Sequence, residues 1–140
     1  MAKKLSPSEA KTLKKLYDEN GLTPDDIFQH RHYTIITRQG IEKIQAQKNI
    51  AVRYEIVHYE PENNSIVMKG FGWVKTKPKD VIETFGEVNS KNNSNSYPWA
   101  MAEKRVLSRL VLKISGLYAE GVFGEDEAED FAKSNPKNKQ

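Results

Sequence analysis

The chain has 140 residues and a mass of 16.0 kDa, which fits one domain with a single hydrophobic core. It contains no cysteine, and this excludes disulfides, thiol catalysis, cysteine-ligated zinc and iron–sulfur clusters. No apolar segment approaches the roughly 20 residues that a membrane-spanning helix needs, and the first residues lack the apolar core of a signal peptide. We therefore expect a cytoplasmic protein with no membrane association.

The net charge of +3 averages two regions of opposite sign. Residues 1–119 carry a formal charge of +6 and residues 120–140 a charge of −3. A basic body attracts polyanions such as nucleic acid, and an acidic tail can cover the same surface or bind a basic partner. Solvated surface charge is the simpler explanation of both, so charge alone identifies no site.

The first 32 residues are expected to form an N-terminal helical segment. Ser6 to Glu9 combine a capping hydroxyl, a proline at the first helical position and a capping-box glutamate. Asn20-Gly21 is typical of a helix end. The β-branched residues 33–37 then predict a brief strand, and Thr37 is expected to cap a second helix that continues to about Lys48.

The apolar pattern changes to a period of two in the middle of the chain, as expected of strands with one buried face. Strands are predicted over 49–60, 65–77 and 81–88, with turns at the prolines between them. Short links predict an antiparallel meander. Gly70 and Gly72 lie within the second strand and indicate a bulge, a bend or a close approach of another backbone.

A polar loop over 89–96 leads to the strongest predicted helix, which Pro98 opens and Gly116 ends. Its apolar side is expected to cover one face of the meander. The fold class is therefore α+β: a three-stranded antiparallel β-meander packed against a long basic amphipathic helix, with flanking helices. An acidic helix over 118–133 and a disordered tail over 134–140 complete the chain.

Three cations follow one flank of this helix at i, i+4 and i+8, namely Arg105, Arg109 and Lys113, and we call them the cationic row. Like charges at this spacing repel each other by a few tenths of a kcal/mol. Phosphates along a nucleic-acid strand would compensate that repulsion. A solvated helix face is the alternative, with about equal weight.

Other basic residues could extend the row. Lys104 flanks it on the helix, and Lys43 belongs to the preceding helix. Arg53, Lys69 and Lys75 are strand residues. In the second strand Lys69, Phe71, Trp73 and Lys75 share one face, an alternation that could stack bases, although burial of the two aromatic side chains in a core or a subunit interface is the more frequent outcome.

The order of elements, and two motifs, resemble the Rad-fifty-two-type single-strand annealing proteins. The first motif is the strand end and loop at 84–92, Thr-Phe-Gly-Glu-Val-Asn-Ser-Lys-Asn, and the second is the helix at 101–113, Met-Ala-Glu-Lys-Arg-Val-Leu-Ser-Arg-Leu-Val-Leu-Lys. The resemblance covers about residues 33–117. It implies a βββα core, assembly into rings or filaments, and a DNA-facing role for the cationic row. Val88, Val106 and Leu110 stand where that pattern has smaller residues.

The sequence therefore predicts binding of single-stranded DNA and annealing without ATP in (phage) homologous recombination by a homo-oligomer. It predicts no enzyme activity, no cofactor and no metal, because the chain has no phosphate-binding loop and no convincing set of catalytic groups. The acidic C-terminal segment could dock a single-strand binding protein or another recombination protein. The alternative is a non-catalytic protein–protein adaptor or structural phage component. His30-Arg31-His32 beside Asp25 and Asp26 lacks a third metal ligand and is given little weight.

Overall fold

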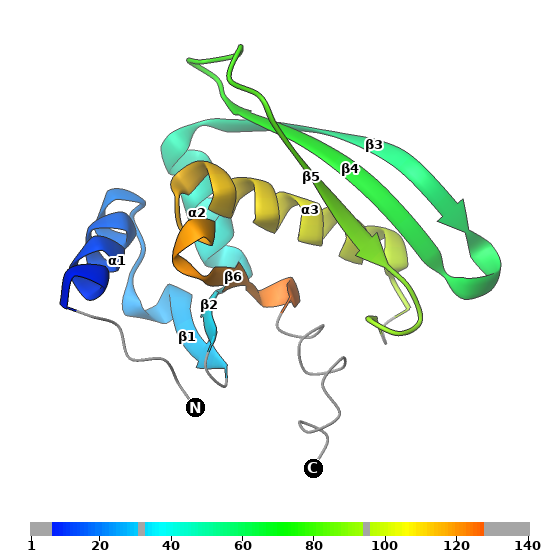
Figure 1. Ribbon diagram of the computed structural model, residues 1–140, viewed down its shortest axis with the longest axis horizontal. Helices are drawn as coiled ribbons and strands as arrows, with labels where there is room; N and C mark the ends of the chain where they lie inside the picture. The colour runs from blue at the N-terminus through cyan, green and yellow to red at the C-terminus, as the bar shows by residue number, and fades with distance from the viewer. Residues whose placement is uncertain (1–6, 31–32, 94–95, 128–140) are drawn as a thin grey trace.

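The computed structural model describes residues 7–30, 33–93 and 96–127, and it confirms the α+β class (Figure 1). Within these ranges, three complete helices and six strands are joined by short turns and single-turn 3₁₀ segments. The elements are α1 (Pro7–Glu19), β1 (Ile27–His30), β2 (Tyr33–Ile36), α2 (Arg38–Lys48), β3 (Ile50–Glu60), β4 (Ser65–Val74), β5 (Ile82–Val88), α3 (Pro98–Ser115) and β6 (Val122–Gly124).

Strands β3, β4 and β5 form an antiparallel sheet in the order β3-β4-β5. Arg53 is paired with Phe71 and Glu55 with Lys69 across β3 and β4, and Lys69 is paired with Phe85 across β4 and β5. The expected strands are therefore present, although β4 ends three residues earlier than predicted. The register shifts in β3 between Ile56 and His58, not at the glycines of β4.

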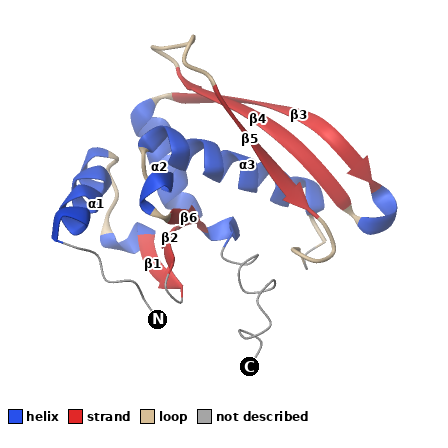
Figure 2. Cartoon of the chain, viewed as in Figure 1, coloured by secondary structure: helices blue, strands red, loops and turns tan. Residues whose placement is uncertain are grey.

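The long helix α3 crosses one face of this sheet, which we call the inner face (Figure 2). A Cβ atom on Gly70 would lie 2.1 Å from Val106 Cγ1, and one on Gly86 would lie 3.0 Å from the carbonyl oxygen of Ala102. These glycines therefore allow the close approach of helix and sheet, which is the third of the roles predicted for Gly70. The core between them consists of Ile66, Met68, Val88, Met101, Ala102, Val106 and Leu110.

A second sheet of three short strands lies on the other side of α3, in the order β1-β2-β6. β1 and β2 form an antiparallel hairpin, and β6 pairs parallel to β2, with Thr34 opposite Val122 and Ile36 opposite Gly124. Only β2 was predicted from the sequence. The sheet and the helices α1 and α2 enclose a second core of Leu13, Leu22, Ile36, Ile41, Ile44, Ile50, Val111, Leu112, Leu117 and Val122.

The predicted helix ends agree with local geometry. The Thr37 hydroxyl accepts a hydrogen bond of 3.1 Å from the Gly40 amide at the start of α2. Gly116 has φ of +85° after α3, the left-handed conformation that ends many helices. Trp99, in the first turn of α3, is 38% exposed and its ring packs against that of Tyr59.

The acidic helix expected over 118–133 starts later than predicted. Residues 118–120 form a 3₁₀ turn and 122–124 form β6. Helix begins only at Glu125, and residues 128–140, which include the predicted tail, lie outside the described part of the chain. The apolar side chain of Val122 explains the difference, because it is fully buried in the second core.

Candidate nucleic-acid interface

Helix α3 lies between the two sheets, and this position removes Arg105 from solvent. Only 1% of Arg105 is exposed. Its guanidinium donates hydrogen bonds of 2.9 Å to the carbonyl of Glu87 and 2.6 Å to the carbonyl of Asn92. The predicted DNA-facing role of Arg105 is therefore wrong for this structure. The residue instead holds the end of β5 and the loop after it.

The rest of the cationic row continues along β5. Arg109 donates to the carbonyl of Phe85, and Lys113 Nζ donates to the hydroxyl of Thr84 at 3.0 Å. A helix advances about 6 Å in four residues and a strand about 6.6 Å in two. The i, i+4 spacing of the two arginines therefore matches the i, i+2 spacing of the carbonyls they bind. The arginines satisfy acceptors on the free side of an edge strand.

Arg109 also forms an ion pair within the chain. Its Nε and Nη2 atoms bind the two carboxylate oxygens of Glu127 at 3.1 Å each, and 18% and 5% of the two side chains are exposed. Burial by itself lowers the pKa of Arg109, but the hydrogen bonds and charge of Glu127 raise it above its usual value. Arg109 is thus neutralised by the protein's own carboxylate, which also contradicts its predicted contact with DNA.

The acidic segment packs against α3 instead of extending into solvent. Asp126 is buried, accepts a hydrogen bond of 3.2 Å from the Ser108 hydroxyl and lies 3.4 Å from Arg38. Burial raises the pKa of Asp126, and the charge of Arg38 partly offsets this. Two of the carboxylates predicted to dock a partner are therefore used inside the fold.

Two more of the residues expected to contact DNA, Lys43 and Lys104, lie away from the sheet face that points away from α3. Lys43 Nζ forms an ion pair of 2.8 Å with the buried Asp26, so its charge is compensated within the chain. Lys104 is half-buried on α3, close enough to Asp126 to lower the pKa of that carboxyl. Neither lysine joins Arg53, Lys69 and Lys75, which all belong to the other side of the sheet.

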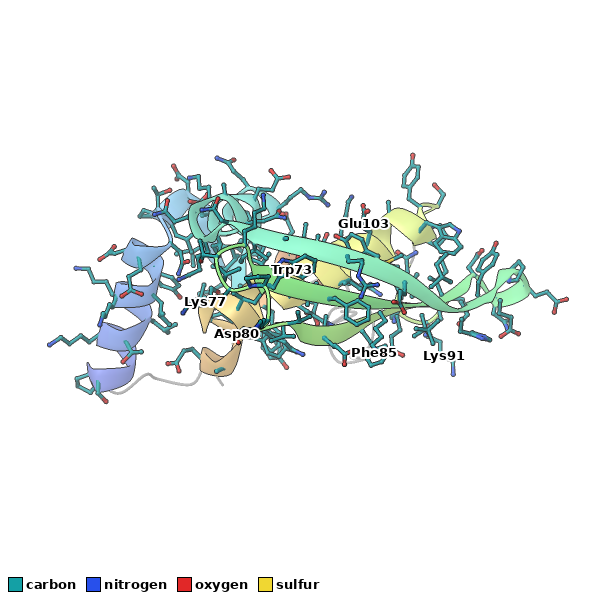
Figure 3. The ribbon with its side chains drawn as sticks, turned by 90° about the horizontal axis from the view of Figure 1, so that it is seen from above. Trp73, Lys77, Asp80, Phe85, Lys91 and Glu103 are labelled. Atoms are coloured by element: carbon teal, nitrogen blue, oxygen red, sulfur yellow. The ribbon has the colours of Figure 1, made fainter. Side chains whose placement is uncertain are left out.

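The face of the β3-β4-β5 sheet that points away from α3, here the outer face, carries three aromatic side chains. Phe71 and Trp73 alternate with buried residues on β4, and Phe85 does the same on β5. Phe85 is paired with Lys69, next to Phe71 on the same face. Figure 3 views the molecule from this side, with Trp73 and Phe85 labelled. We call these three residues the aromatic platform.

Cations lie over the rings of the platform. The Arg53 guanidinium carbon is 4.1 Å from the centroid of Phe71, and Lys69 Nζ is 5.1 Å from the centroid of Phe71 and 5.8 Å from that of Phe85. These distances are typical of cation–π contacts. The alternation predicted on β4 is therefore present, with both aromatic residues half-buried on the sheet surface rather than in a core.

Carboxylates balance the charge of the outer face. Arg53 forms an ion pair of 2.7 Å with Glu55, and Lys69 forms one of 3.0 Å with Glu83. Excess positive charge is found in the turn from β4 to β5, where Lys75, Lys77 and Lys79 are exposed. We call these residues the lysine loop. Figure 3 places Lys77 at the end of the sheet where Trp73 lies.

Sequence reasoning missed Phe85 and the last two lysines of the loop. Phe85 carried a usable signal, because it alternates with Thr84 and Gly86, which are buried in the strand. That parity assigns it to the same face as Glu83. Lys77 and Lys79 flank the turn proline and had been assigned only to a strand end and a turn.

In residues 7–30, 33–93 and 96–127 no three His, Cys, Asp or Glu side chains are grouped to hold a metal ion. Arg31 and His32 of the weighed metal motif lie outside these ranges. In the same part of the chain no helix combines the length and the apolar character required to cross a bilayer.

Comparisons of the chain with known proteins identify no relative. No protein-family model matches the chain, and no curated protein and no solved structure does so either.

Proposed function

We propose that the protein binds single-stranded DNA on the outer face of the β3-β4-β5 sheet and promotes annealing of complementary strands without ATP. The observation that carries the proposal is the aromatic platform, a set of three rings on the sheet surface, of which Phe71 and Phe85 have the Arg53 or Lys69 cation over them. Bases of a single strand stack on such rings whatever their sequence, each contributing about 1–3 kcal/mol. A duplex keeps its bases stacked inside and gains little from the same surface.

The geometry of the platform suits consecutive bases. Phe71 and Trp73 are two residues apart on one strand, which corresponds to about 6.6 Å. Phe85 is a diagonal neighbour of Phe71 across β4 and β5, roughly 7 Å away. These separations are comparable with the step between unstacked nucleotides. The lysine loop lies beyond Trp73 and would bind the phosphates of the strand that continues past the platform.

Annealing and self-association rest on the resemblance of residues 33–117 to the single-strand annealing proteins. The motif over 84–92 forms the end of β5 and its loop, and the motif over 101–113 forms the middle of α3. Both lie in the β3-β4-β5 and α3 unit that we compare with the βββα core of that superfamily. In our proposal the cationic row stabilises this unit. DNA is bound by the outer face of the sheet and not by the cationic row.

A protein–protein adaptor is the second candidate, and the charge balance of the outer face favours it. Three carboxylates, Glu55, Glu83 and Glu87, share the face with Arg53, Lys69 and Lys75. Aromatic and arginine side chains are also enriched at protein interfaces. The two candidates differ in their ligand, so a binding assay separates them.

The proposal is tested by titrating the full chain with a fluorescent single-stranded oligonucleotide and with the matching duplex. We expect tighter binding of the single strand, and faster annealing of two complementary oligonucleotides in the absence of ATP. Equal binding of duplex and single strand would contradict the stacking mechanism. Absence of any binding by folded protein would favour the adaptor.

The lysine loop supplies a salt-dependence prediction. Three phosphate contacts to a single strand correspond to a slope of about −2 in a plot of log K against log salt, at roughly −0.7 for each contact. Replacing Lys75, Lys77 and Lys79 with glutamine should reduce the slope to near zero while stacking on the platform persists. A matched control changes Lys11, Lys14 and Lys15 on the exposed side of α1, and should leave the slope unchanged.

A further inference from the structure

The two edges of the β3-β4-β5 sheet differ in their protection. Arg105 and Arg109 occupy carbonyl acceptors of β5, so a further strand cannot pair along that edge without displacing them. β3 is the opposite edge. Its first carbonyl, of Ile50, accepts a hydrogen bond of 3.3 Å from Gln45, and its register shift lies after Ile56. Among the residues that the structure describes, no further strand pairs with the stretch 52–56 between these features, so this part of the edge can accept another strand.

The residues along this open stretch are self-complementary. Arg53 and Glu55 lie two positions apart on the outer face with Tyr54 between them. Two antiparallel copies of β3 that meet with Tyr54 opposite Tyr54 place each Arg53 opposite the Glu55 of the second copy. Registers centred on Arg53 or on Glu55 place like charges opposite each other, which is destabilising. The charge pattern therefore selects one symmetric register.

The apolar residues agree with that register. On the inner face it brings Ile56 of one copy opposite Val52 of the other. Ile56 is 63% exposed in the single chain, an unusually large value for isoleucine in a strand. Val52 is half-buried and packs against both cores. Pairing would cover Ile56 and extend the apolar surface of the sheet across the two-fold axis.

We infer that two copies of this chain associate through their β3 strands, antiparallel and centred on Tyr54, into one six-stranded sheet. The assembly is isologous, because the same stretch of both copies forms it. A head-to-tail chain of sheets would need the β5 edge that the arginines occupy. This dimer differs from the rings or filaments that the resemblance implies; it does not depend on DNA binding, and its tests contain no DNA.

The decisive experiment is a charge swap followed by sedimentation of the full chain over a range of concentrations. The unaltered protein should form a concentration-dependent dimer. Arg53→Glu and Glu55→Arg should each weaken the dimer at least tenfold, because each places like charges opposite each other. The double variant restores opposite pairs and should restore the dimer. Both positions are more than half exposed, so circular dichroism should show every variant folded.

A cysteine placed on the proposed axis gives an independent test, because the chain has none of its own. Opposed Cα atoms in an antiparallel pair are about 4.5–5.5 Å apart, within the range of Cα separations found in disulfides. Oxidised Tyr54→Cys should form a covalent dimer much faster than Lys91→Cys, which is exposed in the loop after β5. A monomer at all concentrations, a dimer insensitive to the charge changes, or equal rates of cross-linking would overturn the inference.

Discussion

Replacing Arg105 with methionine should lower the free energy of unfolding by about 3 kcal/mol or more. Methionine retains much of the apolar volume of the side chain but removes both of its hydrogen bonds. The carbonyls of Glu87 and Asn92 would lose a charged donor beside a buried site, and an orphaned buried acceptor costs about 1–3 kcal/mol. Urea denaturation followed by circular dichroism measures the change.

Lys113→Met is the matched control. Lys113 belongs to the same cationic row, but it is exposed, donates to the Thr84 hydroxyl and lies 5.3 Å from the centroid of the Tyr118 ring. We expect a loss below about 1 kcal/mol for this variant. If Arg105→Met proved as stable as Lys113→Met and lost DNA binding, the buried position of Arg105 would be wrong and the row would again be the DNA contact.

The helices and the meander were predictable because each has a local cause. Pro7 at the start of α1, Thr37 before α2 and Gly116 after α3 act within one turn of the helix they delimit. The alternation in β3, β4 and β5 likewise needs only one buried face. These signals remain visible in sequence because they do not depend on residues distant along the chain.

The small sheet was not predictable, because its pairing depends on residues that are distant along the chain. β6 has three residues and pairs with β2, from which it is separated by more than 80 positions. A strand of that length has no detectable alternation. Its packing against α3 changes the environment of the helix, since α3 then contacts β4 and β5 on one side and β6 and α2 on the other. A helical wheel assumes one buried side, and this assumption produced the error over Arg105 and Arg109.

The charge segregation of the sequence has a structural explanation that net charge could not reveal. The acidic segment contributes Asp126 and Glu127, whose partners include Arg38 and Arg109 in the basic body. These basic and acidic residues, for which the sequence predicted separate binding partners, therefore neutralise each other. The lysine loop, close to the aromatic platform, is among the sites where basic side chains stay exposed.

Removing the rings of Phe71 and Phe85 together should weaken single-strand binding by at least about 25-fold. Each ring is expected to stack one base, and a lost stack costs about 1–3 kcal/mol, or roughly 5- to 150-fold. The side chains lie on the surface of the sheet and contribute little to either core, so the double alanine variant should remain folded. The measurement is a titration with a fluorescent oligonucleotide at fixed salt.

Tyr97→Ala is the control for loss of an exposed aromatic ring, because Tyr97 is 69% exposed at the start of α3 and does not belong to the outer face. It should bind DNA as the unaltered protein does. A background of Trp99→Phe leaves Trp73 as the single tryptophan, so base stacking on the platform should quench its fluorescence. Two results would exclude the outer face as the binding surface. One is an unchanged affinity for DNA in the folded double variant, and the other is a Trp73 fluorescence that does not change when the oligonucleotide is added.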